Sequence, residues 1–144
     1  MENSNMRLHK FAFDGYGAVQ VATGVATADS TRLILMLFDG LMESLAAARG
    51  HIEHGNTAEK GNSLMRAGRI VIGLQGALDF NQGGDLARNL DDLYGYVTRR
   101  IIHVNAANDL QALEEVRGLM VEIRDAWASL PGLMPAKSAE PTYN

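Results

Sequence analysis

The chain has 144 residues and no cysteine, with 17 acidic against 13 basic side chains and a formal net charge of -4. This length suffices for one domain with a hydrophobic core, and the lack of cysteine excludes disulfides and thiolate metal sites. Because the basic residues are scattered, with only Arg99 and Arg100 adjacent, the composition argues against nucleic-acid binding. The first residues contain no apolar signal segment, so we expect a cytoplasmic protein without membrane insertion.

Residues 1–28 show no helical period, and glycines interrupt their loosely alternating valines. This pattern predicts either a mobile or extended arm or a disordered leader, and the residues alone leave both open. Tyr16 belongs to a small group of aromatic residues that would anchor such an arm. The group also includes Phe11 and Phe13.

The next segment, residues 29–54, predicts a helix that is apolar on nearly all sides. Six apolar residues run without a break from Leu33 to Phe38, and further apolar residues follow as far as Ile52. The segment is too long for a strand and too interrupted to span a membrane. A helix of this kind has to be covered, either by its own chain or by another molecule.

Residues 57–80 predict a second helix. Gly55 suits the end of the preceding helix, and Asn56 with Glu59 resembles a capping box for this one. Its core positions alternate three and four residues apart, as in a seam that packs at a shallow angle against a neighbour. These positions are Leu64, Ala67, Val71, Leu74 and Leu78.

The four residues 81–84, Asn-Gln-Gly-Gly, predict a turn, and the following aspartate favours the start of a helix over residues 85–105. A fourth helix is predicted over residues 109–130, for which Asn108 and Gln111 resemble a capping box. Apolar stripes run through both helices at helical spacing: Leu86, Leu90, Leu93, Val97, Ile101 and Val104 in the third, and Leu110, Leu113, Val116, Met120, Ile123, Trp127 and Leu130 in the fourth.

All three prolines follow residue 130, and a proline inside a helix costs about 3 kcal/mol, so long helices are permitted before that point. Each predicted helix has roughly 20 to 26 residues, or about 30–39 Å at 1.5 Å per residue. Short connections make sequential helices antiparallel. The sequence therefore predicts an all-α, antiparallel up-down four-helix bundle over residues 29–130, with an extended N-terminal arm over residues 1–28 and a flexible C-terminal tail over residues 131–144.

Two of the predicted helices have a second stripe of apolar or small residues, about 100° from the core seam. It consists of Gly61, Met65, Gly68, Ile72 and Gly76 in one helix, and of Ile34, Phe38, Met42 and Leu45 in the other. An interior glycine costs a helix about 1 kcal/mol relative to alanine, so three on one stripe suggest that something packs close to this backbone. Either both stripes face neighbouring helices in a tight bundle, or part of this surface forms a groove for a partner helix.

The chain lacks the constellations typical of catalytic and metal centres. A di-iron bundle needs two Glu-x-x-His motifs, which are absent here. There is also no haem-attachment motif, phosphate-binding glycine loop or serine paired with a base. We therefore expect a non-enzymatic protein without cofactors. The alternative is a four-helix metal-binding or phosphotransfer protein that uses His51, His54 or His103, all of which lie near predicted helix ends.

Several short motifs follow one another along the chain. None of them is specific for a protein family alone, but their order and spacing together are. Residues 27–30 read Thr-Ala-Asp-Ser, and residues 33–40 read Leu-Ile-Leu-Met-Leu-Phe-Asp-Gly. After Gly83-Gly84 come Ala87, Asn89-Leu90, Leu93-Tyr94, Tyr96 and Arg99-Arg100, and residues 122–127 read Glu-Ile-Arg-Asp-Ala-Trp. Over about residues 25–127 this order resembles the family of flagellin-specific export chaperones called FliS.

The resemblance implies a cytoplasmic helical bundle that binds the C-terminal segment of newly made flagellin and prevents its premature polymerisation. It also implies delivery of this client to the flagellar type III export apparatus, without catalysis or a cofactor. The chain departs from the family pattern where Ser30 replaces a proline and Phe38 replaces a tyrosine. Family members often carry two tyrosines near the N-terminus, in an arm that can lie over the client groove. In this chain only Tyr16 matches one of them. Exposed apolar helix surface also allows a weak homodimer, and an adaptor for another amphipathic helix is a further alternative.

We expect the partner groove at residues that lie off the main core seams of their helices, with Tyr16 of the arm beside it. These residues are Ile34, Phe38, Met42, Met65, Gly68, Ile72, Gly76 and Tyr96.

Overall fold

The computed structural model describes residues 28–129, which fold into four helices. The helices are α3 (Ala28–His54), α4 (Thr57–Gly76), α5 (Phe80–Ala107) and α6 (Leu110–Ser129). Tyr16, the predicted N-terminal arm up to residue 27 and the predicted C-terminal tail lie outside the described residues.

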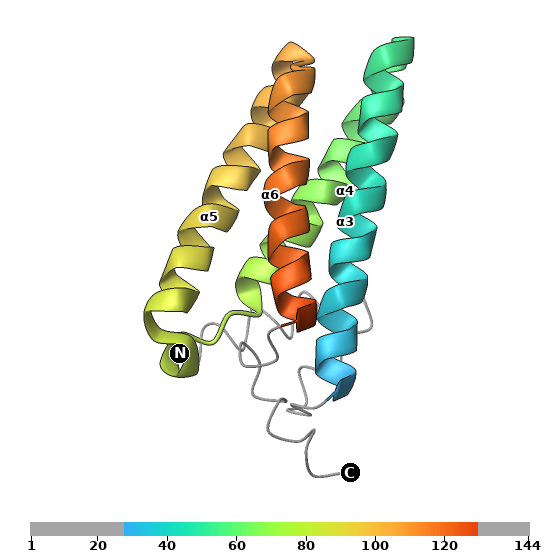
Figure 1. The fold of residues 1–144 in the computed structure, drawn as a ribbon. Helices are drawn as coiled ribbons and strands as arrows, with labels where there is room; N and C mark the ends of the chain where they lie inside the picture. The colour runs from blue at the N-terminus through green and yellow to red at the C-terminus, as the bar shows by residue number, and fades with distance from the viewer. Residues whose placement is uncertain (1–27, 130–144) are drawn as a thin grey trace.

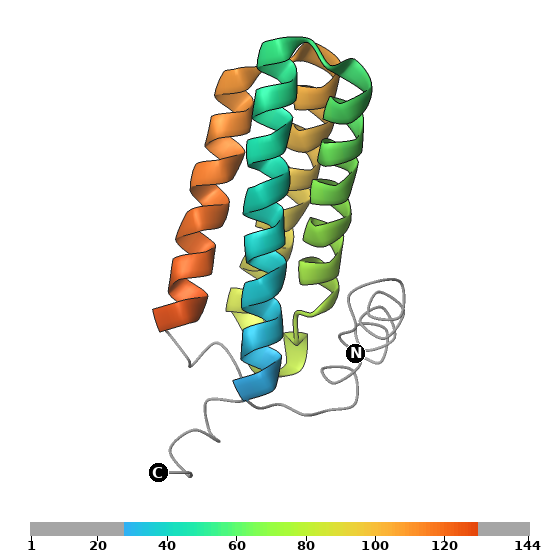
Figure 2. The same cartoon turned by 90° about the vertical axis from the view of Figure 1, so that its right-hand side faces the viewer.

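Sequential helices run side by side in opposite directions, and α6 closes the bundle against α3. In Figure 1, α6 lies in front between α5 and α3, with α4 behind; Figure 2 shows α3 in front, flanked by α6 and α4. The predicted all-α antiparallel four-helix bundle is thus confirmed over the described part of the chain. None of the helices between residues 28 and 129 combines the length and apolar character needed to cross a membrane.

One hydrophobic core runs through the bundle and takes side chains from all four helices. Its largest fully buried side chains include Phe38 and Leu41 of α3, Ile70 of α4, Tyr94 of α5 and Met120 of α6. All five positions of the predicted α4 seam are buried. Burial also raises the pKa of the Tyr94 hydroxyl, because the phenolate would be poorly solvated there.

The predicted stripe of α5 is buried only in its C-terminal half. Val97, Ile101 and Val104 belong to the core, whereas Leu90 and Leu93 are half-buried and Leu86 is 46% exposed. The apolar pattern therefore predicted the helix but overstated how much of its first turns faces the core.

The connection between α3 and α4 is closed by backbone contacts. Gly55 has a φ of 74°, a left-handed conformation that glycine adopts at low cost. The Asn56 N–H then donates to the His51 carbonyl at 2.8 Å. Gly55 thus ends the helix as predicted, but Asn56 makes no side-chain cap, so the predicted capping box with Glu59 is wrong.

The structure moves the boundary between the second and third predicted helices. α4 ends at Gly76, and Asp79 Oδ1 accepts hydrogen bonds from the N–H groups of Asn81 and Gln82, each at 3.0 Å. This cap starts α5 at Phe80, so residues 81–83 are helical instead of forming the predicted turn. Gly84, with φ 53° and ψ -127°, then breaks the helix once before it continues.

The connection between α5 and α6 is capped by a different residue from the one predicted. Asn108 takes a left-handed conformation, with φ 53°, and ends α5, while Asp109 Oδ1 accepts the Ala112 N–H at 3.0 Å and caps α6. The His103 Nε2 atom lies 3.0 Å from Asp109 Oδ2. The Ala112 N–H first, and then His103, lower the pKa of Asp109. The predicted Asn108–Gln111 capping box is wrong because the chain turns at Asn108.

Two polar contacts join α4 and α5, one toward each end of the pair. At the C-terminal end of α5, the ammonium of the buried Lys60 side chain donates to the Asn105 carbonyl at 2.9 Å and to Asn108 Oδ1 at 2.7 Å. At the other end, Gln75 Nε2 donates to Asp91 Oδ1 at 2.8 Å. These contacts fix the antiparallel register of the two helices.

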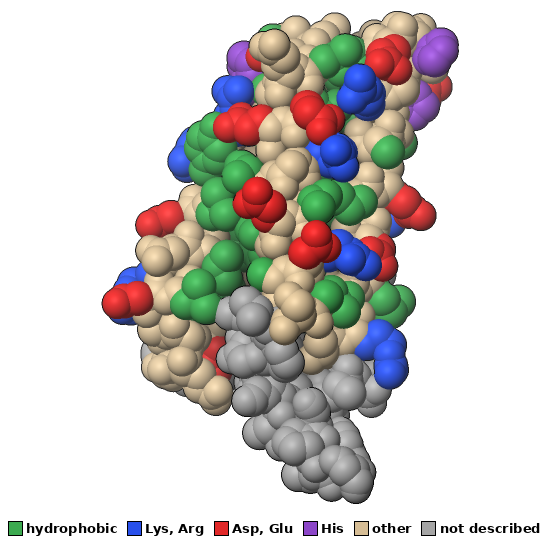
Figure 3. Space-filling view, viewed as in Figure 1, with side chains coloured by type: hydrophobic (Ala, Val, Ile, Leu, Met, Phe, Trp, Pro, Cys, Tyr) green, Lys and Arg blue, Asp and Glu red, His purple; other side chains and the backbone are tan. Residues whose placement is uncertain are grey.

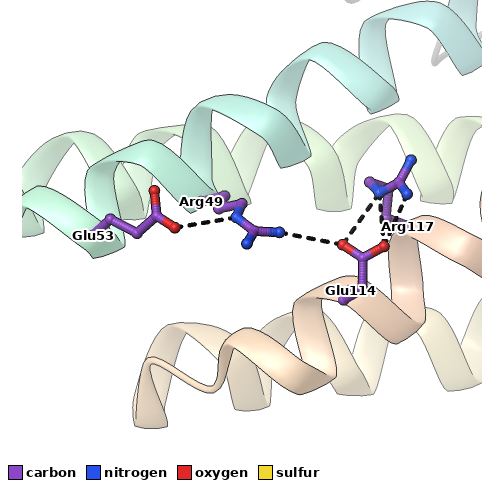
Figure 4. Close-up of polar contacts among 4 residues, drawn as sticks. All are labelled: Arg49, Glu53, Glu114 and Arg117. Carbon is purple, nitrogen blue, oxygen red and sulfur yellow. Dashed lines mark hydrogen bonds and ion pairs between the residues drawn. The ribbon is translucent and has the colours of Figure 1, made fainter.

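Exposed ion pairs join α6 to α3. Figure 4 shows Arg49 of α3 between Glu53 of its own helix, at 3.2 Å, and Glu114 of α6, at 3.4 Å; Arg117 also contacts Glu114, at 2.8 Å. Further along the same interface, Arg124 Nε lies 2.8 Å from Asp39 Oδ1. Exposed pairs typically contribute about 0.2–1 kcal/mol each, so they guide the register of α6 more than they stabilise the fold.

Candidate partner-binding site

Four of the predicted groove residues pack toward the interior of the bundle. Phe38 is 0% exposed and Ile34 is 5% exposed, and both belong to the core cluster. Gly76 is buried at the end of α4, and Met42 is half-buried against the core. In this conformation these residues support the helices, and they offer a partner little or no accessible surface.

Tyr96 is half-buried and already has a partner on the neighbouring helix. Its hydroxyl donates to Glu115 Oε2 of α6 at 2.6 Å, and Arg100 Nε donates to the other oxygen at 3.1 Å. The contact with Glu115 raises the pKa of Tyr96, and the two donors lower the pKa of Glu115. Tyr96 therefore takes part in the junction between α5 and α6.

The outer face of α4 presents the remaining predicted residues. Met65 is 57% exposed and Ile72 is 52% exposed. A methyl group placed on Gly61 or Gly68 would meet no other atom within 4 Å. The first explanation of this stripe, contact with a neighbouring helix, is therefore wrong for these four residues, which form an uncovered surface in residues 28–129.

A residue of α5 extends the same kind of surface, and the sequence analysis did not single it out. Ile102 is 64% exposed, the highest value among the exposed large hydrophobic residues of the described chain. Its signal was the pair Ile101-Ile102: because Val97, Ile101 and Val104 define the core side, Ile102 has to point about 100° away from it. Gly95, seven residues earlier, lies on the same face of α5.

Helix register places these two faces side by side. The α4 segment 61–72 and the α5 segment 95–102 both lie between the Lys60–Asn105 contact at one end and the Gln75–Asp91 contact at the other. In antiparallel helices this makes the two segments neighbours. We call the surface that they form the α4–α5 strip; it consists of Gly61, Met65, Gly68 and Ile72 of α4 and Gly95 and Ile102 of α5.

A second apolar surface lies on a different side of the molecule. Figure 3 shows the face made by α5, α6 and α3, where hydrophobic side chains gather along the junction of α5 and α6. The apolar residues of this junction, such as Leu93 and Leu119, are half-buried and pack against the core. The α4–α5 strip is the better candidate because three large apolar side chains on it are more than half exposed.

An open hollow on the described residues is lined mostly by polar residue types. It lies between α3 and α4, has a volume of about 430 Å3, and is lined by Glu43, Ser44, Ala47, Asn62, Ser63 and Arg66. Arg66 donates to Ser44 Oγ at 2.6 Å and to the Gly40 carbonyl at 3.2 Å across it. These contacts use the arginine to join the two helices.

The histidines that the alternative prediction invoked have separate partners. His54 Nδ1 lies 2.8 Å from the Gly50 carbonyl, His51 faces Asn56, and His103 contacts Asp109. Between residues 28 and 129, no three His, Cys, Asp or Glu side chains are grouped so that they could hold a metal ion.

The comparisons with known proteins agree with one another. The family profile described as "Flagellar protein FliS" matches residues 12–132. The chain is 42% identical over 116 residues to "Flagellar secretion chaperone FliS" of Salmonella typhimurium, covering 80% of this chain and 86% of that protein. It is 40% identical over 116 residues to "Flagellar secretion chaperone FliSB" of Pseudomonas aeruginosa, covering 81% and 92%. "Flagellar secretion chaperone FliS" of Bacillus subtilis is 33% identical over 103 residues, covering 72% of this chain and 76% of that protein.

Proposed function

The chain belongs to the FliS family of flagellar proteins, and on that premise we propose that it is a flagellar secretion chaperone whose client is the C-terminal segment of flagellin. The chaperone holds this segment in the cytoplasm before export, prevents premature polymerisation, and delivers it to the flagellar type III export apparatus. The activity is binding and release, for which neither catalysis nor a cofactor is needed.

The observation that carries the proposal is the uncovered α4–α5 strip. Such a contiguous apolar surface on a soluble domain marks an interaction site more often than a chance exposure. The glycines leave room for a second helix to approach the α4 backbone closely, and methionine adapts its shape to different apolar partners. A helix that buries its apolar face in the filament would need this kind of cover while it is still unassembled.

The residues divide into two roles in this proposal. Met65, Gly68 and Ile72 contact the client directly, together with Ile102, because their surfaces are accessible. The buried members of the predicted set, including Phe38 and Ile34, maintain the helices that present the strip. Tyr16 belongs to the segment that precedes the described residues, and we propose that it also contacts the client.

The proposal is tested by calorimetric titration of this chain with the C-terminal segment of flagellin from the same organism, about 40–50 residues long. We expect a dissociation constant well below about 1 μM and a strongly negative heat-capacity change, since apolar surface is buried and the client folds on binding. The N-terminal segment of the same flagellin is the control and should bind weakly. Absence of heat with both the full chain and a chain lacking residues 1–24 would contradict the assignment of the client.

Replacing Gly68 with alanine should separate the effect of this glycine on the stability of the helix from its effect on client binding. Gly68→Ala should raise the free energy of unfolding by up to about 1 kcal/mol, because alanine favours helix and no atom lies within 4 Å of the new group. The same change should weaken client binding about tenfold if a helix packs against this backbone.

Gly118→Ala on α6 is the matched control, since Gly118 is also helical with open space around it. It should stabilise the protein similarly, as measured by urea denaturation, without changing the titration. Equal affinity for both variants and the native chain would show that no client backbone approaches Gly68.

A further inference from the structure

Charge is distributed unevenly around the α4–α5 strip. The chain as a whole is acidic, yet its segments 61–76 and 93–107 contain four arginines and no Asp or Glu. Two of these arginines have partners outside the strip: Arg66 contacts Ser44 and Glu43 of α3, and Arg100 contacts Glu115 of α6. The segments that border the strip are therefore locally basic.

The other two arginines remain without such partners. Arg69 and Arg99 are exposed and form no hydrogen bond or ion pair with any residue in 28–129. Most other arginines in residues 28–129 form hydrogen bonds or ion pairs, and they lie on all four helices. Unpaired cations beside an apolar surface are available for a partner's carboxylates.

Helical spacing places both arginines at the edges of the strip. Arg69 follows Met65 by four residues and precedes Ile72 by three, so it lies on the same face of α4 as these two side chains. Arg99 has the corresponding position on α5, four residues after Gly95 and three before Ile102. The strip therefore has an apolar centre with one arginine on each of its two helices.

We propose that Arg69 and Arg99 make the α4–α5 strip selective for an amphipathic helix with carboxylates beside its apolar stripe. This inference rests on the proposed function, because it specifies the chemistry of the helix that the same strip accepts. The apolar contacts supply most of the affinity, and the guanidinium groups select the partner and its direction by pairing with Asp or Glu. Two copies of this chain would bring like charges together at the strip, so it disfavours self-association.

Designed helices test this selectivity independently of flagellin. Three peptides of about 20 residues, long enough to span ~30 Å as helices, share one apolar stripe and carry Glu, Gln or Lys beside it. Their dissociation constants for the full-length chain are measured by calorimetry at about 0.05 M and about 0.5 M salt. We expect the Glu peptide to bind about tenfold more tightly than the Gln peptide at low salt, and the Lys peptide to bind least.

Variants of the two arginines assign the preference. Arg69→Gln with Arg99→Gln should make the Glu and Gln peptides bind equally, and Arg69→Glu with Arg99→Glu should reverse the order in favour of the Lys peptide. High salt should erase the native preference, because exposed pairs are screened. Arg117→Gln is the matched control, since it removes one positive charge from α6, which does not border the strip, and should change nothing.

Each outcome decides between the inference and the proposed function. If flagellin fails to bind while the Glu peptide keeps an arginine-dependent preference, the client assignment is wrong and the selectivity stands. If flagellin binds but the three peptides bind equally, or none of them binds, the selectivity is wrong and the client assignment stands. A concentration-dependent dimer that Ile72→Glu dissociates would also overturn the inference, because a second copy would then occupy the strip.

Discussion

Ile72→Glu is expected to abolish client binding while the four-helix bundle stays folded. Ile72 is 52% exposed on the outer face of α4, so a polar residue there meets water in the free protein. Surface substitutions of this kind usually change the free energy of unfolding by less than about 0.5 kcal/mol. In the complex the same position would be covered by the client helix.

The expected loss of affinity follows from two costs that arise only in the complex. Covering an isoleucine side chain contributes about 1.5–3 kcal/mol, which the variant forfeits. A carboxylate enclosed in an apolar contact also loses its hydration. Together they predict that the dissociation constant in the flagellin titration rises by a factor of roughly 100 or more. The circular dichroism spectrum should not change.

A second variant separates the two costs, and a third provides the control. Ile72→Gln removes the apolar contact without adding charge, so its effect should be smaller than that of Ile72→Glu. Met36→Glu introduces the same carboxylate at a 58% exposed residue of α3, a helix that does not border the strip, and should bind normally. An Ile72→Glu chain that loses helix would place Ile72 in the core, contrary to its exposure here.

The sequence predicted the bundle because its evidence is redundant. Seams such as Leu64–Ala67–Val71–Leu74 repeat along each helix, and no proline interrupts them before residue 131. Helix ends depend on only one or two hydrogen bonds each and were predicted less well. Asp79 and Asp109 provide the caps that the pattern had assigned elsewhere, because an aspartate competes for the same N–H groups as the neighbouring asparagine or glycine turn.

The sequence predicted the exposure of the candidate site residues only in part, and the reason is geometric. On a helix that is apolar on two faces, the period shows that two stripes exist but not which one faces the core. On α4 the stripe with Met65 and Ile72 points outward, whereas on α3 the stripe with Ile34 and Phe38 points inward. That choice is made by contacts between helices distant in the sequence, and the pairing of each arginine depends on the same contacts.

Phe38 shows where this difference matters most, because its place off the main core seam of α3 predicted it to be a groove residue. Its side chain is 0% exposed and lies among the largest buried groups of the core. Phe38→Ala is therefore expected to lower the free energy of unfolding by about 3–5 kcal/mol, since it leaves a cavity that the bundle cannot fully close. That is a large part of the ~5–15 kcal/mol that holds a typical domain together.

Urea denaturation followed by the fluorescence of Trp127, the single tryptophan and 9% exposed in the core, measures this loss. Met36→Ala, two residues away on the same helix but 58% exposed, is the matched control and should cost less than about 0.5 kcal/mol. The milder Phe38→Leu keeps most of the volume and should lower stability by only about 1–1.5 kcal/mol.

Phe38→Leu also decides between the two roles of this residue. If Phe38 acts only through the core, the folded fraction of the Leu variant should bind flagellin with native affinity, because the α4–α5 strip is unchanged. If the affinity falls as far as in Ile72→Glu while the protein remains folded, the client contacts Phe38 directly. Such a contact would require α3 to move outward and expose a side chain that the free bundle buries, so binding would open the core rather than cover a surface already present.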